Sequence, residues 1–189
     1  ADREALWQEV MALRYPGTQL IGESGGDPVA VVPYDPAWPE AFVAWRERLA
    51  VALGGAARRI EHVGSTAVPG LAAKPVIDIQ VSVPEVADET AYVPALEGLG
   101  LPLRAREPGH RYFRPSRGSP RDVQIHVCES GSAWERAHLL FRDYLRAHPT
   151  ARAAYAALKG TLAEKYRDDR VAYNEAKTGF ILDALEAAE

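Results

Sequence analysis

The stretch RIEHVGSTAVPGLAAKPVIDIQVSV, residues 59–83, contains the central strand–turn–strand pattern of the chain. Two β-branched runs, 60–63 and 76–83, predict buried strands, because short apolar runs rich in Val and Ile and bounded by turn residues are typical of sheet interiors. Between them lies the turn Gly64-Ser65-Thr66, whose backbone N–H groups and hydroxyls can bind an anion. We therefore expect a hairpin-like pair of strands that carries a phosphate-binding turn.

Length, charge and cysteine content favour one main domain that binds small molecules. The chain has 189 residues, a net charge of −4 and a pI near 5.8, which argues against general nucleic-acid binding but allows a local basic pocket. The single cysteine, Cys128, excludes an internal disulfide and is expected to be a buried small hydrophobic residue. The sequence shows neither an apolar run of about 18–20 residues nor a signal-peptide core, so we expect a cytoplasmic protein that does not contact membranes, either monomeric or dimeric.

The pattern of the whole chain predicts an α+β fold: a small mixed β-sheet, helices packed on it and a C-terminal three-helix segment. Residues 1–28 are interpreted as an extension, with a helix over 2–14 and a glycine-rich loop over 22–28, and the domain is expected to occupy 29–189. In this domain we expect strands at 29–32, 101–106, 110–114 and 121–128, and helices from Asp35 to Gly54 and within 88–98. The helical third, about 132–189, is expected to contain one helix opened by Ser132 and Glu135, one begun by Pro149, and one capped by Asp168 or Asp169.

Polar side chains occur on one face of two of these strands. Asp78 and Gln80 alternate with isoleucines and valines, and so do Gln124 and His126 on the strand 121–128. A carboxylate in so apolar a run needs a cation, a hydrogen-bond network or an opening to a cleft. If the two strands are neighbours, these four residues form a polar patch that lines a ligand site. The alternative for Asp78 is a structural ion pair with a nearby lysine or arginine.

The patch suggests a site for one divalent metal at Asp78 and His126. A single carboxylate with histidine suits a transition metal at least as well as magnesium, so Mg, Mn, zinc, iron and nickel all stay open. His62 ends the strand before the glycine-serine turn, and it is interpreted as a metal ligand, a general base or a hydrogen-bonded core histidine. Asp78, His62 and His126 are thus the candidate catalytic residues.

Basic residues are expected to hold a small phosphate-containing ligand. Lys74 lies between the turn and the Asp78 strand, and Arg114 alternates with His110 and Tyr112. Lys159 and Lys177 each follow a tyrosine by four residues on predicted helices, which places phenol and ammonium together. The alternative is that these lysines are ordinary solvated charges. The predicted ligand-binding residues are Gly64, Ser65, Thr66, Lys74, Gln80, Gln124, Arg114, Lys159 and Lys177.

Six ordered segments closely resemble the GrpB family over about residues 29–185: VPYDPAWPEAF, IEHVGSTAVPGLAAKPVIDI, QIHV, LLFRDYLRAHP, YAALKGTLAEKY and YNEAKTGFI. This family occurs alone or fused to dephospho-CoA kinase, and its fold belongs with the polymerase-β-like nucleotidyltransferases. The resemblance implies that Gly64 and Ser65 form the phosphate-binding turn and that Asp78 is the first position of an Asp-x-Asp metal motif.

The same resemblance implies a divergent site. Gln80 stands where active nucleotidyltransferases usually carry a second carboxylate, and the third acidic position falls near Gln124 or His126. Two-metal catalysis needs several carboxylates, so standard nucleotidyl transfer is not expected. Three hypotheses follow: a divergent nucleotidyl- or phosphoryl-transfer enzyme, a non-catalytic module that binds a nucleotide or CoA-like anion, or a metal-dependent enzyme that uses His62, Asp78 and His126 on another substrate.

Overall fold

The computed structural model describes residues 18–21 and 28–188. The helix predicted over 2–14, and all but the last residue of the loop predicted over 22–28, lie outside these described residues. None of the described helices is long and apolar enough to span a membrane.

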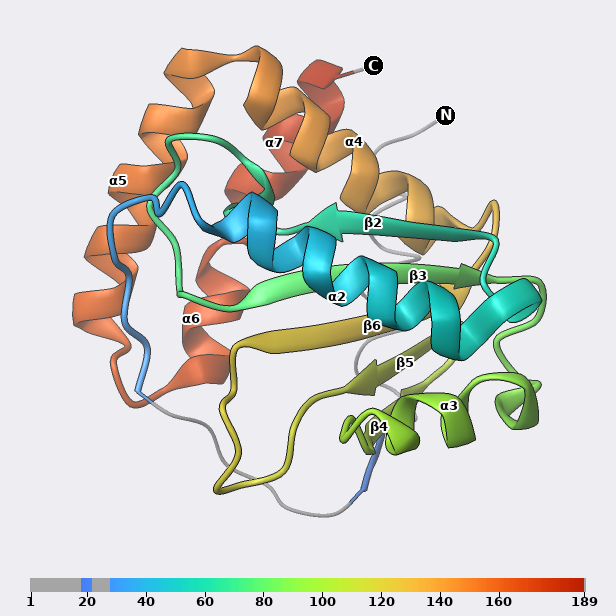
Figure 1. Ribbon diagram of the computed structural model, residues 1–189. Coiled ribbons are helices and arrows are strands. Elements are labelled where there is room, and N and C mark those ends of the chain that lie inside the picture. Colours follow the sequence, from blue (N-terminus) through green and yellow to red (C-terminus); the bar gives the residue numbers. More distant parts are fainter. Residues whose placement is uncertain (1–17, 22–27, 189) are drawn as a thin grey trace.

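The described residues form a six-stranded sheet in the order β1-β4-β5-β6-β3-β2 (Figure 1). Its strands are β1 (Gln19–Leu20), β2 (Arg59–Val63), β3 (Ile77–Val83), β4 (Leu103–Glu107), β5 (His110–Phe113) and β6 (Val123–Glu129). The central pair β3 and β6 is parallel, and all other pairs are antiparallel. The predicted α+β fold is confirmed, and β3 and β6 are neighbours, as the expected polar patch requires.

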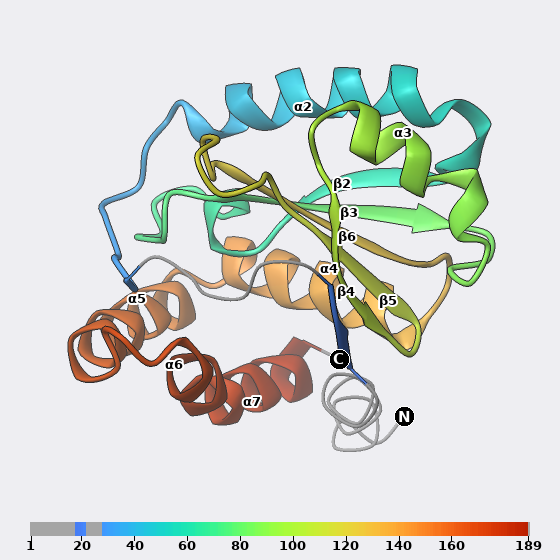
Figure 2. The same cartoon turned by 90° about the horizontal axis from the view of Figure 1, so that it is seen from below.

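Helices cover both faces of this sheet (Figure 2). One face carries α2 (Trp38–Leu53) and α3 (Val93–Gly98), and the other carries α4 (Ala133–Ala147), α5 (Pro149–Lys165), α6 (Arg170–Ala176) and α7 (Thr178–Ala188). Side-chain alternation assigns Ile77, Ile79 and Val81 of β3 to the face of α2, where they are buried with Leu49 and Leu53. Asp78 and Gln80 consequently point to the face of α4 to α7.

The strand predicted at 29–32 is not present. Val32 makes an isolated bridge with Ala73, and the N–H group of Val29 donates to the carbonyl of Arg167. Pro33 follows directly and lacks an N–H group, so it cannot extend a ladder. The sheet instead gains β1, which lies in the predicted N-terminal extension and pairs with β4.

Further boundaries differ from the prediction, among them those of β5 and β6, predicted at 110–114 and 121–128 and observed at His110–Phe113 and Val123–Glu129. Asp35 accepts a hydrogen bond from the Ala37 N–H group at 2.8 Å, but the helix starts only at Trp38, so Asp35 forms the turn before it. The strand predicted at 101–106 runs from Leu103 to Glu107. The last predicted helix is two helices, α6 and α7, because the chain tightens at Lys177, whose N–H group donates to the Asn174 carbonyl three residues back.

Other predicted signals hold. Asp169 accepts from the Ala172 N–H group at 3.0 Å and caps α6, while Ser132 accepts from the Glu135 N–H group at 3.2 Å and caps α4. Gly54 ends α2 with a φ of 52°, and Cys128 is fully buried. Burial raises the pKa of the Cys128 thiol to about 12, which fits a packing role.

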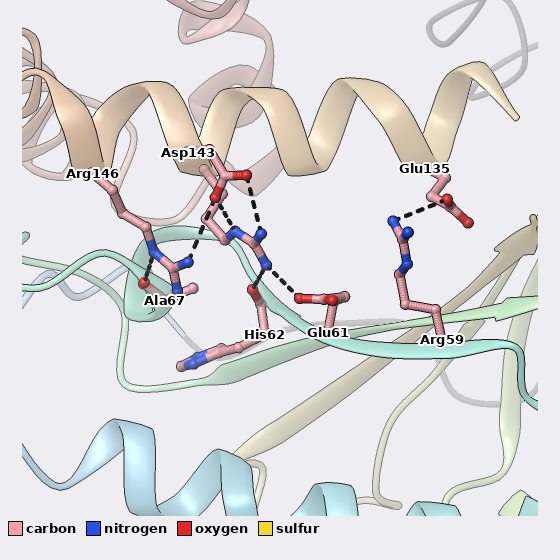
Figure 3. Close-up of polar contacts among 8 residues, drawn as sticks. Arg59, Glu61, His62, Ala67, Glu135, Asp143 and Arg146 are labelled. Atoms are coloured by element: carbon pink, nitrogen blue, oxygen red, sulfur yellow. Dashed lines mark hydrogen bonds and ion pairs between the residues drawn. The ribbon is translucent and has the colours of Figure 1, made fainter. Parts of the chain in front are cut away.

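Two arginines of α4 fasten this helix to β2 and to the glycine-serine turn (Figure 3). The buried Arg142 donates to a Glu61 carboxylate oxygen at 2.8 Å and to the His62 carbonyl at 3.0 Å, and its other nitrogens reach the neighbouring Asp143. Arg146 donates to the Ala67 carbonyl at 2.9 Å. These contacts fix the position of α4 relative to β2 and the turn.

We expect Arg142→Met to lower the free energy of unfolding by about 2 kcal/mol, because a half-buried carboxylate and a carbonyl lose their donor. Urea denaturation measures this change. The control is Arg136→Met on an exposed position of the same helix, which should change stability by about 0.5 kcal/mol or less. Equal effects of the two substitutions would show that the Arg142 contacts do not stabilise the fold.

Candidate functional site

The site is centred on Asp78, where β3 and β6 run side by side. The strand register places Asp78 opposite Gln124 and Gln80 opposite His126. The Asp78 Oδ1 atom lies 3.2 Å from His126 Nε2. With its amide oriented to satisfy its neighbours, Gln124 donates to the same Oδ1 at 3.1 Å and accepts from the Tyr112 hydroxyl at 3.0 Å. Asp78, Gln124 and His126 are therefore brought together, as the sequence predicts.

The Gly64 turn packs directly against this carboxylate. Gly64 has φ 70° and ψ −172°, a conformation that is essentially restricted to glycine. A Cβ atom at this position would lie 2.6 Å from Asp78 Oδ2. The close approach explains why a glycine precedes Ser65, and it places the phosphate-binding candidate next to Asp78.

Lys159 of α5 reaches the turn from the helical side. Its ammonium donates to Ser65 Oγ at 2.8 Å and to the Ala72 carbonyl at 2.5 Å, and it lies 4.9 Å from the centre of the Tyr155 ring. Lys159 is only 2% exposed, so it is not the solvated charge that was the alternative. Burial, and then the nearby positive charge of Lys177, lowers the pKa of Lys159 to about 7.

Lys177 extends the positive charge beside Lys159. Its ammonium lies 4.2 Å from the centre of the Tyr173 ring, so both predicted Tyr–Lys pairs do bring an ammonium to a phenol ring. Burial raises the pKa values of both tyrosines, Tyr155 and Tyr173, which keeps the phenols neutral beside the lysines.

His62 and Thr66 lie together on the other side of the turn. His62 stacks on Phe42 of α2, with ring centres 4.8 Å apart, and its Nε2 atom lies 2.9 Å from Thr66 Oγ1. Thr66 in turn donates to the Val76 carbonyl at 3.3 Å. Burial lowers the pKa of His62 to about 4, so the ring is neutral at pH 7. Among the interpretations of His62, this placement favours the hydrogen-bonded core histidine.

The remaining predicted ligand-binding residues differ in their access to the site. Gln80 is completely buried, and its amide has no hydrogen-bond partner within the described ranges. Arg114 follows the end of β5 and is 9% exposed. Its pKa is lowered, mainly by burial and further by the positive charges of Arg121 and Arg170. Lys74 lies in the connection that leads from the turn into β3 and is half-buried.

Sequence reasoning missed several residues of this group. Arg170, at the start of α6, donates to the correctly oriented Gln124 amide at 3.3 Å, although no sequence pattern singles it out. His110 lies next to His126 and contacts Glu107. The alternation of His110 and Tyr112 was visible in the sequence, but only the pairing of β5 with β6 shows which face they share with His126.

The residues at Asp78 do not fit a metal cluster of the nucleotidyltransferase kind. In the part of the chain that the structure describes, no group of three or more His, Cys, Asp or Glu side chains is arranged to hold a metal ion. Asp78 and His126 are hydrogen-bonded to each other, and the other neighbour of Asp78 is the neutral Gln124. A two-metal site needs several carboxylates, so we derive no chemical step through a metal here.

Comparison with known proteins places this arrangement in a family. The family model described as GrpB protein matches residues 28–187. The chain belongs to the GrpB family. A UPF0157 protein of Streptomyces coelicolor is 43% identical over 164 residues, which cover 87% of this chain and 86% of that protein.

GrpB relatives also include a solved structure and a longer protein. The crystal structure of the conserved protein GrpB from Enterococcus faecalis is 32% identical, with a TM-score of 0.74, and the similarity covers 84% of this chain and 96% of that one. A protein named dephospho-CoA kinase from Mycolicibacterium paratuberculosis is 34% identical over 85% of this chain but only 46% of its own length. The implied family and its occurrence within dephospho-CoA kinase chains are thus confirmed, and the α+β fold is similar to that of a solved GrpB protein.

Proposed function

We propose that this GrpB family protein binds a small phosphate-containing ligand, such as a nucleotide, at the Gly64-Ser65 turn beside Asp78. The observation that carries the proposal is the buried ammonium of Lys159, which donates a hydrogen bond to Ser65 Oγ. Its two hydrogen-bond acceptors are a hydroxyl and a carbonyl, so neither brings a negative charge to it.

A buried ammonium without a nearby anion is costly, and the lowered pKa of Lys159 reflects this cost. Lys177 adds a second positive charge close by. A phosphate oxygen at Ser65 would pair with Lys159 in a charge-assisted hydrogen bond, and the backbone N–H groups of the turn would supply further donors. These groups therefore favour an anionic ligand at this site.

Binding without turnover is the form of this function that the residues support best, because the second carboxylate that transfer chemistry needs is replaced by the neutral, buried Gln80, while Asp78 lies against Gly64. A phosphoryl- or nucleotidyl-transfer enzyme is the second candidate. It is favoured by the position of Asp78 Oδ2, which lies against Gly64 and thus beside a phosphate held at Ser65. A ligand that is chemically altered after long incubation, detected by chromatography, would favour the enzyme over the binding module.

Isothermal titration with ATP and with inorganic tripolyphosphate tests the proposal, in buffers without metal and with Mg²⁺ or Mn²⁺. We expect saturable binding that Ser65→Ala weakens about 5- to 10-fold, since one hydrogen bond contributes about 1 kcal/mol. Thr161→Ala is the matched control, because this hydroxyl lies exposed on α5 and reaches only the Ala157 carbonyl. No binding at millimolar ligand, or equal loss in both variants, would contradict the proposal.

A further inference from the structure

We infer that Glu107, His110 and His126 form a hydrogen-bonded chain that orients the Asp78 carboxylate, so that Glu107 and His110 are positioning residues of the ligand site. This inference rests on the proposed phosphate-binding function and deepens it. It concerns two residues, on β4 and β5, that lie outside the glycine-serine turn and the lysine pair.

This hydrogen-bonded chain of side chains crosses four neighbouring strands, from β4 through β5 and β6 to β3. Glu107 Oε2 lies 2.9 Å from His110 Nδ1, His110 Nε2 lies 3.1 Å from His126 Nδ1, and His126 Nε2 lies 3.2 Å from Asp78 Oδ1. The side chains at the Glu107 end are 13% and 7% exposed, whereas those of His126 and Asp78 are 17% and 28% exposed. The chain thus starts at a more buried carboxylate and ends at the more open one beside the turn.

Aromatic packing holds the two imidazoles in place. Trp134 of α4 stacks on His110 at 4.6 Å and on His126 at 5.4 Å, and His138 stacks on Trp134 at 3.5 Å. Tyr112 lies against His126 as well, with ring centres 5.4 Å apart. Since the rings cannot turn freely, their nitrogen atoms stay aimed along the chain.

The direction of the hydrogen bonds follows from counting protons. Ionised Glu107 and Asp78 only accept, so His110 Nδ1 and His126 Nε2 must each carry a hydrogen. The contact between the two rings needs a third hydrogen, because two bare nitrogen atoms at 3.1 Å would repel. The carboxylate at each end of the chain thus accepts a hydrogen bond from the imidazole next to it.

This arrangement has two consequences for a ligand at Ser65. Asp78 Oδ1 is occupied by His126 and Gln124, so Oδ2, which lies against Gly64, is the oxygen left to accept from the ligand. The two hydrogen bonds to Oδ1 also hold the carboxylate in one orientation beside the turn. The chain therefore suits a phosphate ester or polyphosphate that also carries a hydrogen-bond donor, such as a hydroxyl group.

Glu107→Gln tests the inference through the imidazole nitrogens. A glutamine amide can donate to His110 Nδ1, so every hydrogen bond of the chain can then form with two neutral histidines. In the intact protein, ¹⁵N NMR should show hydrogen on His110 Nδ1 and on His126 Nε2. In Glu107→Gln, His110 Nδ1 should lose its hydrogen while His126 Nε2 keeps its own. Glu129→Gln, an exposed carboxylate on β6, should leave both signals unchanged.

Ligand affinity supplies the second readout, with ATP as the probe, because its ribose hydroxyl groups can donate to Asp78 Oδ2. We expect Glu107→Gln to weaken binding about 5- to 10-fold in the intact protein, as for one charge-assisted contact, and to have no further effect in a His126→Gln background, because the chain is already broken there. Equal losses in both backgrounds, or a His110 Nδ1 without hydrogen in the intact protein, would overturn the inference. If neither ATP nor tripolyphosphate binds, the proposed function fails, and the NMR result still decides whether the hydrogen-bonded chain exists.

Discussion

Gly64→Ala is expected to lower the free energy of unfolding by about 3–5 kcal/mol and to remove ligand binding. Two costs add here. The backbone conformation of Gly64 is one that other residues rarely adopt, at about 1–3 kcal/mol, and the new methyl group would lie 2.6 Å from Asp78 Oδ2. To relieve this overlap, either the turn or the carboxylate must move, and the two are the parts of the site that must stay together.

A matched control separates the two costs. Gly100 also has a positive φ, 80°, but a Cβ atom added there would meet nothing within 4 Å. Gly100→Ala should therefore cost only about 1 kcal/mol. Urea denaturation of both variants measures the difference. If Gly64→Ala were no more destabilising than Gly100→Ala, this result would contradict the close packing of the turn against Asp78.

Lys159→Met is expected to weaken the binding of tripolyphosphate by about 100-fold, because charge-assisted hydrogen bonds contribute up to about 3 kcal/mol. Methionine retains the length and apolar character of the lysine side chain, so the helix should still pack. Isothermal titration measures the affinity, and Lys165→Met, an exposed position on the same helix, is the control. Undiminished binding in Lys159→Met would remove the main support for the proposed site.

The lowered pKa of Lys159 gives the intact protein a distinctive pH dependence, which Lys159→Met should lose. In the folded protein Lys159 has a pKa of about 7, whereas an unfolded lysine has about 10.4. Between these values the unfolded state binds more protons, so this group makes stability rise with pH from about 7 to about 10. Affinity for the anion should instead fall as the pH rises above 7, since Lys159 loses its charge.

Denaturation and titration at pH 7 and pH 9 check both trends. Lys159→Met should lose the part of the stability increase that belongs to this lysine, and its weak residual affinity should change less between the two pH values than that of the intact protein. If the intact protein bound tripolyphosphate more tightly at pH 9 than at pH 7, a role for protonated Lys159 in binding would be contradicted.

Much of the central sheet was predictable from local pattern. The β-branched runs around the glycine-serine turn form β2 and β3. Alternation along β3 predicted that Asp78 lies on one face of the sheet and the core residues Ile77 and Ile79 on the other. The same alternation put Gln124 and His126 on one face of β6. Capping residues such as Ser132 and Asp169 marked helix starts correctly, because a cap depends on atoms only a few residues away.

Other parts depend on contacts that local pattern does not contain. His62 is the next-to-last residue of β2, and it contacts Phe42 and Thr66 because β2 presents this position to α2. The prediction of a strand at 29–32 was wrong because a strand needs a neighbouring strand to pair with, and Val32 forms only an isolated bridge with Ala73. The break between α6 and α7 likewise left no clear sequence signal.

Motifs and alternation in the sequence were thus enough to predict the family, the central strands, the glycine at the turn and the residues that share a face with Asp78. Three-dimensional packing was needed to show that Lys159 is buried against Ser65, that Arg170 donates to Gln124, and that Glu107 and His110 continue the contact from His126. The physical reason is range: periodicity and steric limits act within a few residues, whereas the pairing of β5 with β6 and the packing of α5 on the turn join positions that are far apart in the chain.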